Sequence, residues 1–213
     1  MRMVKYTHAC VRLHDGDRDL LIDPGTWAED AALDGAGDVL VTHEHADHID
    51  LDRLIAAYRA NPALRVFMPS AVATQVIEKS PSFEPATHAI AVGDSFTAGG
   101  FPIRAVGGHH AEVYDGLPGC ANIGYVVADA IYHPGDSVFV PDGRVDTLLV
   151  PTSGPWLKLA EAIDFVRAVR PARAYSIHDA LLSEKGEALV DRLLAAKGET
   201  DYGRIPLGDS IDL

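Results

Sequence analysis

A histidine-rich hexapeptide constrains this chain more than any other segment. Residues 43–48 read His-Glu-His-Ala-Asp-His and directly follow the apolar run Val39–Thr42, which is typical of a buried strand. Side chains two residues apart in an extended segment point the same way, so His43 and His45 can bind one metal ion together. A solvated, acidic loop is the alternative interpretation, but it gives no reason for ligands at these offsets beside a buried strand.

The side chains in the second half of the hexapeptide are expected to point in a different direction from His43 and His45. Asp47 and His48 fall where the chain turns into a predicted helix, Leu51–Ala60, with Asp50 as its N-cap. This change of direction aims the second pair at a neighbouring ion. Imidazole and carboxylate ligands suit zinc by default, and also manganese and iron, and two adjacent pairs suit two divalent ions about 3.5–4 Å apart.

Two ions need more ligands than the hexapeptide holds, and further candidates follow other strand-like runs. Three such runs end in His or Asp: the run before His109 and His110, the run before Asp136, and the run before His178. Loops at strand ends are where α/β folds place their chemistry. The sequence therefore predicts one centre assembled from four loops.

The order of these ligands resembles the metallo-β-lactamase superfamily. Within it, Asp23–Gly25, Gly108–Ala111 and Tyr132–Ser137 resemble the compact metal-dependent hydrolase branch. That branch is similar to L-ascorbate-6-phosphate lactonase and, more remotely, to the N-acyl-phosphatidylethanolamine phospholipase D. The resemblance extends roughly from Met3 to Ile205. It implies an α/β fold, a four-layer αββα sandwich of the metallo-β-lactamase type, with the metals at one edge between the sheets.

The resemblance also implies a role for each ligand. The first metal would be held by His43, His45 and one of His109 or His110, and His110 is favoured because His-Ala after a Gly-containing turn is the form associated with this branch. The second metal would be held by Asp47, His48 and His178, and Asp136 would bridge both.

Five further residues are expected to support the ligands or to contact substrate. His8 and His109 are candidates for either role, and Asp23 is expected beneath the metal-binding loop, because carboxylates there orient ligating imidazoles. Trp156 and Lys158 lie in a Pro-Gly-Pro loop, which either presents a flat wall and a cation to substrate or packs Trp156 on the core. Residues 112–118 are expected to form another wall of the cleft.

The composition favours a single enzyme domain over residues 1–213. With 47% hydrophobic residues the chain can bury one sizeable core, and its net charge of −13 argues against a nucleic acid partner. No stretch is apolar enough to span a membrane and none resembles a signal peptide, so the cytoplasm is the expected location. A homo-oligomer is left open. Cys10 and Cys120 are each expected to be small core residues.

The alternation of patterns predicts strands and helices in the order of two similar halves, consistent with a remote duplication. Helices are predicted at Leu51–Ala60, Ser70–Glu78, Lys158–Val169 and Lys185–Ala196. Strands are predicted at Val4–His8, Cys10–His14, Arg18–Ile22, Arg65–Phe67, Ala89–Val92, Phe101–Val106, Ile123–Val127, Ala130–Tyr132, Thr147–Val150 and Arg173–Ile177.

The chemistry expected of such a centre follows from charge. Two dications with Asp47 and Asp136 leave a net charge of about +2, and a metal-bound water has its pKa lowered to about 7, so a hydroxide exists at neutral pH. We expect hydrolysis of an ester-type bond, such as a lactone, phosphodiester or thioester, in a small anionic metabolite. A noncatalytic metal-binding protein and an RNA-processing nuclease are the alternatives. Redox chemistry is disfavoured because the similar flavodiiron proteins carry a flavin domain.

Overall fold

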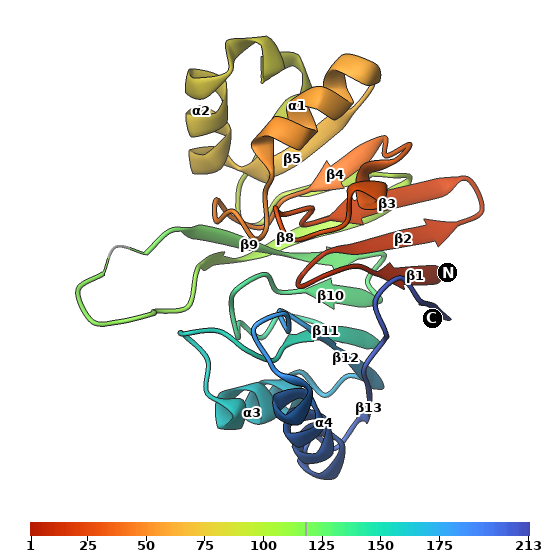
Figure 1. The fold of residues 1–213 in the computed structure, drawn as a ribbon, viewed down its shortest axis with the longest axis vertical. Coiled ribbons are helices and arrows are strands. Elements are labelled where there is room, and N and C mark those ends of the chain that lie inside the picture. Colours follow the sequence, from red (N-terminus) through yellow and green to blue (C-terminus); the bar gives the residue numbers. More distant parts are fainter. Residues whose placement is uncertain (118) are drawn as a thin grey trace.

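Two seven-stranded sheets pack face to face, and helices lie on the outer side of each sheet (Figure 1). The computed structural model describes residues 1–117 and 119–213, so the predicted wall at residues 112–118 can be followed only to Leu117. The layer order is helix, sheet, sheet, helix. This arrangement confirms the predicted αββα sandwich.

The first sheet comes mainly from the N-terminal half. Its strand order is β14 (Ser210–Asp212), β1 (Arg2–Lys5), β2 (Val11–Asp15), β3 (Arg18–Ile22), β4 (Asp38–Leu40), β5 (Arg65–Pro69) and β6 (Thr87–Ile90). Pairings from β14 to β3 are antiparallel and those from β3 to β6 are parallel. The predicted Asp15-Gly16 hairpin turn is present, with Gly16 in the left-handed region at φ +60°.

The second sheet repeats this plan with the C-terminal half. Its strand order is β13 (Asp201–Gly203), β12 (Arg173–Ile177), β11 (Thr147–Pro151), β10 (Ile131–His133), β9 (Ala121–Val127), β8 (Phe101–His109) and β7 (Ser95–Ala98). Pairings from β7 to β10 are antiparallel and those from β10 to β13 are parallel. Each sheet thus joins three antiparallel pairings to three parallel ones, which is consistent with a remote duplication.

In the described part of the chain, four α-helices and two short 3-10 helices complete the fold. They are α1 (Leu51–Ala60), α2 (Ser70–Lys79), α3 (Leu159–Val169), α4 (Glu184–Lys197), η1 (Asp30–Leu33) and η2 (Pro81–Ala86). The predicted N-cap of α1 is confirmed, because the Asp50 side chain accepts a hydrogen bond from the Arg53 amide. No helix in residues 1–117 and 119–213 has the length and apolar character needed to cross a bilayer.

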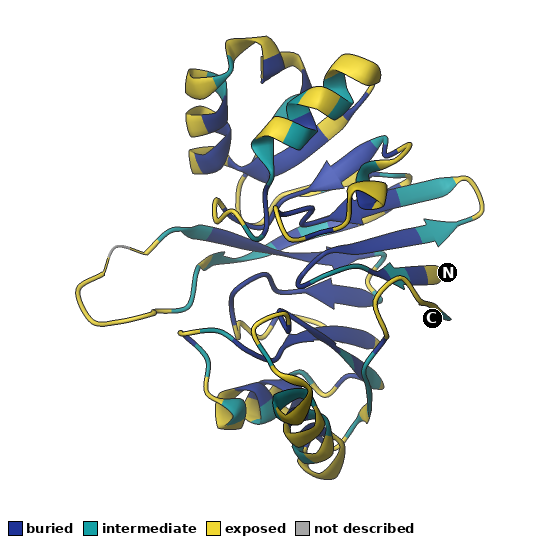
Figure 2. Ribbon diagram, viewed as in Figure 1, coloured by how far each residue is buried: buried dark blue, intermediate teal, exposed yellow. Residues whose placement is uncertain are grey.

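Three apolar layers hold the sandwich together. One lies between the sheets and contains Leu13, Ile103 and Tyr125; a second lies between the first sheet and α1 and α2; a third lies between the second sheet and α3 and α4. Strand β9 shows the cause, because Tyr125 enters the central layer while its neighbour Val126 enters the outer one. Figure 2 shows the strands largely buried and the helices exposed on their outer faces.

One strand prediction was wrong in a way that affects the site. Strand β1 ends at Lys5, and His8, which was predicted to end it, lies beyond it in the left-handed region at φ +67°. The short strands β7, β13 and β14 were not predicted, because each has three or four residues and too little pattern to detect.

The turn after β3 touches the hexapeptide loop directly. A Cβ atom placed on Gly25 would lie 2.0 Å from the carbonyl oxygen of Asp47. Only glycine therefore allows this close approach between the Asp23–Gly25 turn and the loop that presents the predicted ligands.

We predict that Gly25→Ala lowers the free energy of unfolding by about 1–3 kcal/mol, because the added methyl group must displace backbone rather than a flexible side chain. Urea denaturation measures this change. Gly37→Ala is the matched control, since a Cβ there meets nothing within 4 Å. Equal stability of the two variants would contradict the close approach.

Candidate metal centre

The predicted ligands converge from both sheets. The loop after β4 carries the hexapeptide, and the loops after β8, β10 and β12 carry His110, Asp136 and His178. These loops meet at one edge of the sandwich, as the resemblance implied. The sequence separates them by up to 135 residues, so the fold alone brings them together.

The convergent side chains form two adjacent groups. In each group the nitrogen and oxygen atoms that could bind an ion lie within 4.8 Å of one another. The first group is His43, His45, His110 and Asp136, and the second is His8, Asp47, His48 and His178. His110 rather than His109 enters the first group, and His109 is exposed at the end of β8.

Asp136 lies between the two groups. Its Oδ1 is 3.0 Å from Nε2 of His48, and its Oδ2 is 3.0 Å from Nε2 of His178. Oδ2 is also 3.2 Å from Nε2 of His110. The carboxylate therefore contacts residues of both groups, which is the position expected of a bridging ligand.

Three histidines use their outer nitrogen as a hydrogen-bond donor. Nδ1 of His48 donates to Asp23 at 2.7 Å, Nδ1 of His178 to the Ser153 carbonyl at 2.6 Å, and Nδ1 of His110 to the Ala111 carbonyl at 2.5 Å. With the proton on Nδ1, the neutral ring directs the lone pair of Nε2 into the centre. This is the tautomer that a metal ion requires.

His43 and His45 meet with nitrogen facing nitrogen. Nδ1 of His43 lies 3.0 Å from the Thr42 hydroxyl, which itself donates to Asp23, so His43 is the donor there. Its Nε2 lies 3.1 Å from Nδ1 of His45. The outer Nε2 of His45 lies 3.9 Å from the sulfur of Cys120. A cation placed between these two nitrogens could accept a lone pair from each and replace their mutual contact.

Buried atoms without partners mark the same place. His48 Nε2, His178 Nε2 and Asp136 Oδ1 have no hydrogen-bond partner among the described residues. An unsatisfied buried polar atom costs about 1–3 kcal/mol, and three of them share one small volume. Divalent cations would satisfy all three atoms together, so the residues present fit a metal centre.

Asp23 is hydrogen-bonded to the hexapeptide loop and to the residue before it. It is fully buried and accepts hydrogen bonds from the amide and the hydroxyl of Thr42 and from the ring of His48. Its backbone is left-handed at φ +51°, an arrangement that the surrounding hydrogen bonds stabilise.

His8 contacts the second group directly. Its Nδ1 accepts a hydrogen bond from the Ala180 amide at 3.3 Å, so Nε2 carries the proton and donates to Asp47 at 3.1 Å. His8 is thereby a hydrogen-bond donor to a predicted ligand. Its carbonyl accepts from the His178 amide at 3.1 Å and from the Lys5 ammonium at 2.7 Å.

The two residues predicted in the Pro-Gly-Pro loop differ in their surroundings. Trp156 is 8% exposed, and its indole nitrogen donates to Oδ2 of Asp136 at 3.0 Å. Neither interpretation of the loop included this contact. The side chain of Lys158 is 84% exposed and lies 3.9 Å from Glu161.

Several supporting residues have no signal in the sequence. Lys5 is 1% exposed and joins His8 to Asp179, and Asn122 accepts a hydrogen bond from the Asp136 amide. Such polar residues act through backbone contacts and have no characteristic spacing in the sequence.

Cys120 was predicted to be a core residue, and that prediction was wrong because Cys120 lines a pocket beside His45.

The charges of the centre are strongly coupled. Burial lowers the pKa of His48, but Asp136 and Asp23 outweigh it and raise the pKa to about 10. Burial raises the pKa of Asp136, but the positive charge of His48 and the close approach of the neighbouring histidines hold it well below the usual range. Burial lowers the pKa of His43 well below its usual value. The two carboxylates beside His48 therefore favour the protonated form of its ring.

We predict that metal binding at slightly alkaline pH releases about one proton from His48, because the pKa of about 10 lies above that pH and ligation needs the neutral ring. Calorimetric titration in buffers of different ionisation enthalpy counts the proton. Asp23→Asn should reduce the release and weaken metal binding about 10–100-fold. Identical proton release by both proteins would contradict this charge assignment.

The fold and the sequence both have known counterparts. Protein Rv0786c of Mycobacterium tuberculosis is 35% identical over 212 residues, which covers 97% of each chain. The metallo hydrolase Igni18 of Ignicoccus hospitalis superposes with a TM-score of 0.76 at 16% identity, covering 99% of this chain and 97% of that one. The metallo-β-lactamase fold protein YhfI of Bacillus subtilis gives 0.73 at 16% identity, covering 96% and 91%.

A family model settles the wider relationship. The model of the beta-lactamase superfamily domain matches residues 2–178, which include every residue of the two groups. The closer resemblance to L-ascorbate-6-phosphate lactonase stays a prediction. The chain belongs to the beta-lactamase superfamily.

Proposed function

We propose that this protein is a metal-dependent hydrolase that uses two divalent ions, zinc by default, to cleave an ester-type bond in a small metabolite. The observation that carries the proposal is the convergence of His48, His178 and Asp136, whose buried inner atoms lack hydrogen-bond partners among the described residues. His43, His45 and His110 would hold the first ion, Asp47, His48 and His178 the second, and Asp136 would contact both.

When bound, such ions supply a water-derived nucleophile at neutral pH and polarise the carbonyl or phosphoryl oxygen of the substrate. The protein residues fix the geometry. Trp156 and Asn122 hold Asp136 through its side chain and its amide, respectively. His8 holds Asp47 by donating a hydrogen bond from Nε2 to that carboxylate.

The charge of the centre bears on the substrate. Two dications exceed the charge of Asp47 and Asp136 by about +2, which favours negative charge on the atoms that meet the ions. A lactone, thioester or phosphodiester each develops such charge during hydrolysis. We therefore propose a small molecule with one of these bonds, in which negative charge lies or develops at the reacting group.

The centre is accessible, which favours catalysis over a sealed structural site. A hollow of about 470 Å³ has His45 and His110 in its lining, and the Asp47 side chain is 21% exposed. A nuclease is less well supported, since the net charge of −13 opposes a polyanion.

Oxygen chemistry is the second candidate. CmlA, a diiron β-hydroxylase from Streptomyces venezuelae, shares the fold with a TM-score of 0.74 at 17% identity, covering all of this chain and 54% of that one. The proposed ligands favour hydrolysis, because five imidazoles accompany only two carboxylates among them, whereas many oxygen-activating iron centres use more carboxylates. Oxygen uptake by the iron-loaded protein distinguishes the two functions.

We predict that Asp136→Ala lowers hydrolysis more than about a hundredfold, because its loss removes the contact common to both ions. The measurement is turnover of the metal-loaded protein on a panel of lactones, thioesters and phosphodiesters, together with metal content and circular dichroism. Asp142→Ala, an exposed carboxylate six residues on, is the control and should keep full activity. Unchanged turnover in Asp136→Ala would contradict the two-metal proposal.

A further inference from the structure

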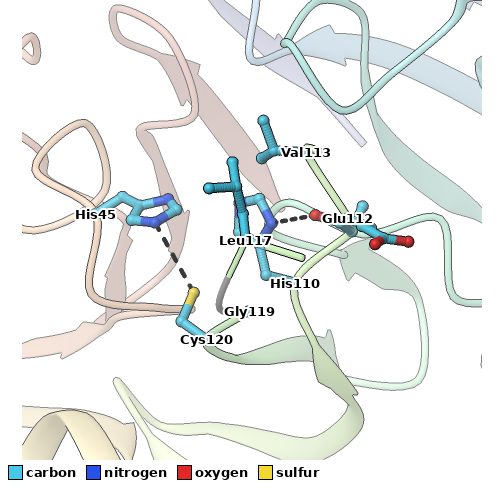
Figure 3. Close-up of a pocket in the computed structure, with 8 residues that line it drawn as sticks. His45, His110, Glu112, Val113, Leu117, Gly119 and Cys120 are labelled. Atoms are coloured by element: carbon cyan, nitrogen blue, oxygen red, sulfur yellow. Dashed lines mark hydrogen bonds between the residues drawn. The ribbon is translucent and has the colours of Figure 1, made fainter. Parts of the chain in front are cut away.

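The loop between β8 and β9 builds a hollow directly on the metal centre. The hollow has a volume of about 470 Å³, within the range of small-molecule sites. Its described lining is His45, His110, Ala111, Glu112, Val113, Leu117, Gly119 and Cys120. Figure 3 shows Leu117, Val113 and His110 in the lining of this hollow, with Cys120 beside His45. A group bound here would touch two proposed ligands of the first ion.

The loop between β8 and β9 exposes apolar side chains to solvent, where polar side chains are the more usual choice. Val113 is 40% exposed, Tyr114 is 72% exposed and Leu117 is 56% exposed, all within five residues. Exposed apolar side chains gathered in one place mark binding surfaces. On the side of the second group, the ring of Trp27 is 44% exposed and lies 4.6 Å from the ring of His8. Apolar surface therefore lies beside both groups of the centre.

Apart from the two histidines, the described lining has no cationic side chain that could bind an anion. Among its described residues Glu112 is the one side chain with a full charge, and that charge is negative. The nearest hollow, of about 320 Å³ on the Trp156 side of the loop, does contain Lys158, but Glu112, Asp115 and Glu161 line it as well. Away from the metal ions, a phosphate or carboxylate on the substrate would meet net negative charge.

We infer that this hollow binds an uncharged, apolar acyl group of the substrate, so that the protein hydrolyses esters, thioesters or lactones of apolar acids. The inference rests on the proposed hydrolysis and adds the chemical class of the acid. The oxygen of water bonds to the carbonyl carbon, the bond from that carbon to the leaving oxygen or sulfur breaks, and the leaving group takes up a proton. Negative charge is thereby confined to the atoms that face the ions.

The test compares two esters that share a leaving group and a chain length. The zinc-loaded protein is assayed on para-nitrophenyl butanoate and on the para-nitrophenyl monoester of succinic acid, which differs by a terminal carboxylate. We expect kcat/KM to be at least about tenfold higher for the butanoate, because a carboxylate without a partner is costly to bury. Leu117→Lys should reverse this preference by placing a cation in the hollow. Leu189→Lys, an equally drastic change at a 45% exposed leucine on α4, should leave it unchanged.

A second measurement does not depend on catalysis. Butanamide, a neutral probe, is titrated into metal-free protein, and the methyl resonances of Val113 and Leu117 are followed by nuclear magnetic resonance. We expect both to shift in the wild type, and the Val113 shift to be lost in Leu117→Lys. Succinate should cause no shift at the same concentration.

The outcomes separate the two proposals. Equal or better hydrolysis of the succinyl ester, or a Leu117→Lys variant with the preference of Leu189→Lys, overturns the apolar assignment while hydrolysis stands. If neither ester is hydrolysed, the proposed function fails for these bonds and the methyl resonances decide: shifts with butanamide support the apolar site, and their absence overturns it.

Discussion

The crowding of lone pairs around Asp136 is the constraint on which the structure depends. Nε2 of His48, His178, His110 and His43 all lie within 3.8 Å of this carboxylate. Asp136 and Asp23 favour a proton on His48, whereas His178 and His110 donate from Nδ1 to backbone carbonyls outside the centre. The fold forces these groups together, and metal ions are what make such an arrangement favourable.

Holding the groups in place requires backbone that is itself strained. His8, Asp23 and His178 all have positive φ, a conformation that costs about 1–3 kcal/mol at a non-glycine residue. A buried ion network offsets this cost near the second group. Lys5 binds the carbonyl of His8 and the carboxylate of Asp179, and Arg204 binds the same carboxylate at 2.6 Å. The two sheets are thus fastened to each other at the point where the ligands meet.

Much of this centre could be predicted from the sequence, because ligand chemistry and strand ends both leave a pattern. The hexapeptide after β4, the choice of His110 over His109 and the place of Asp23 beneath the loop agree with the observed geometry. The contact from Trp156 to Asp136 could not be predicted, because it depends on how a loop folds rather than on any spacing.

The wrong predictions for His8 and Cys120 also result from how distant parts of the chain meet. His8 was predicted to end a strand, but it lies in a turn where its carbonyl accepts hydrogen bonds from the Lys5 ammonium and the His178 amide. Cys120 looks like a core residue in its apolar context, yet the β8–β9 loop opens beside it. Local sequence predicts an element, whereas contacts from distant residues decide where it ends.

Anomalous X-ray diffraction from crystals of the zinc-loaded protein tests the central claim most directly. The account predicts two zinc peaks about 3.5–4 Å apart, one among His43, His45 and His110, the other among Asp47, His48 and His178, with Asp136 contacting both. A single peak, or two peaks of which Asp136 touches neither, would contradict it.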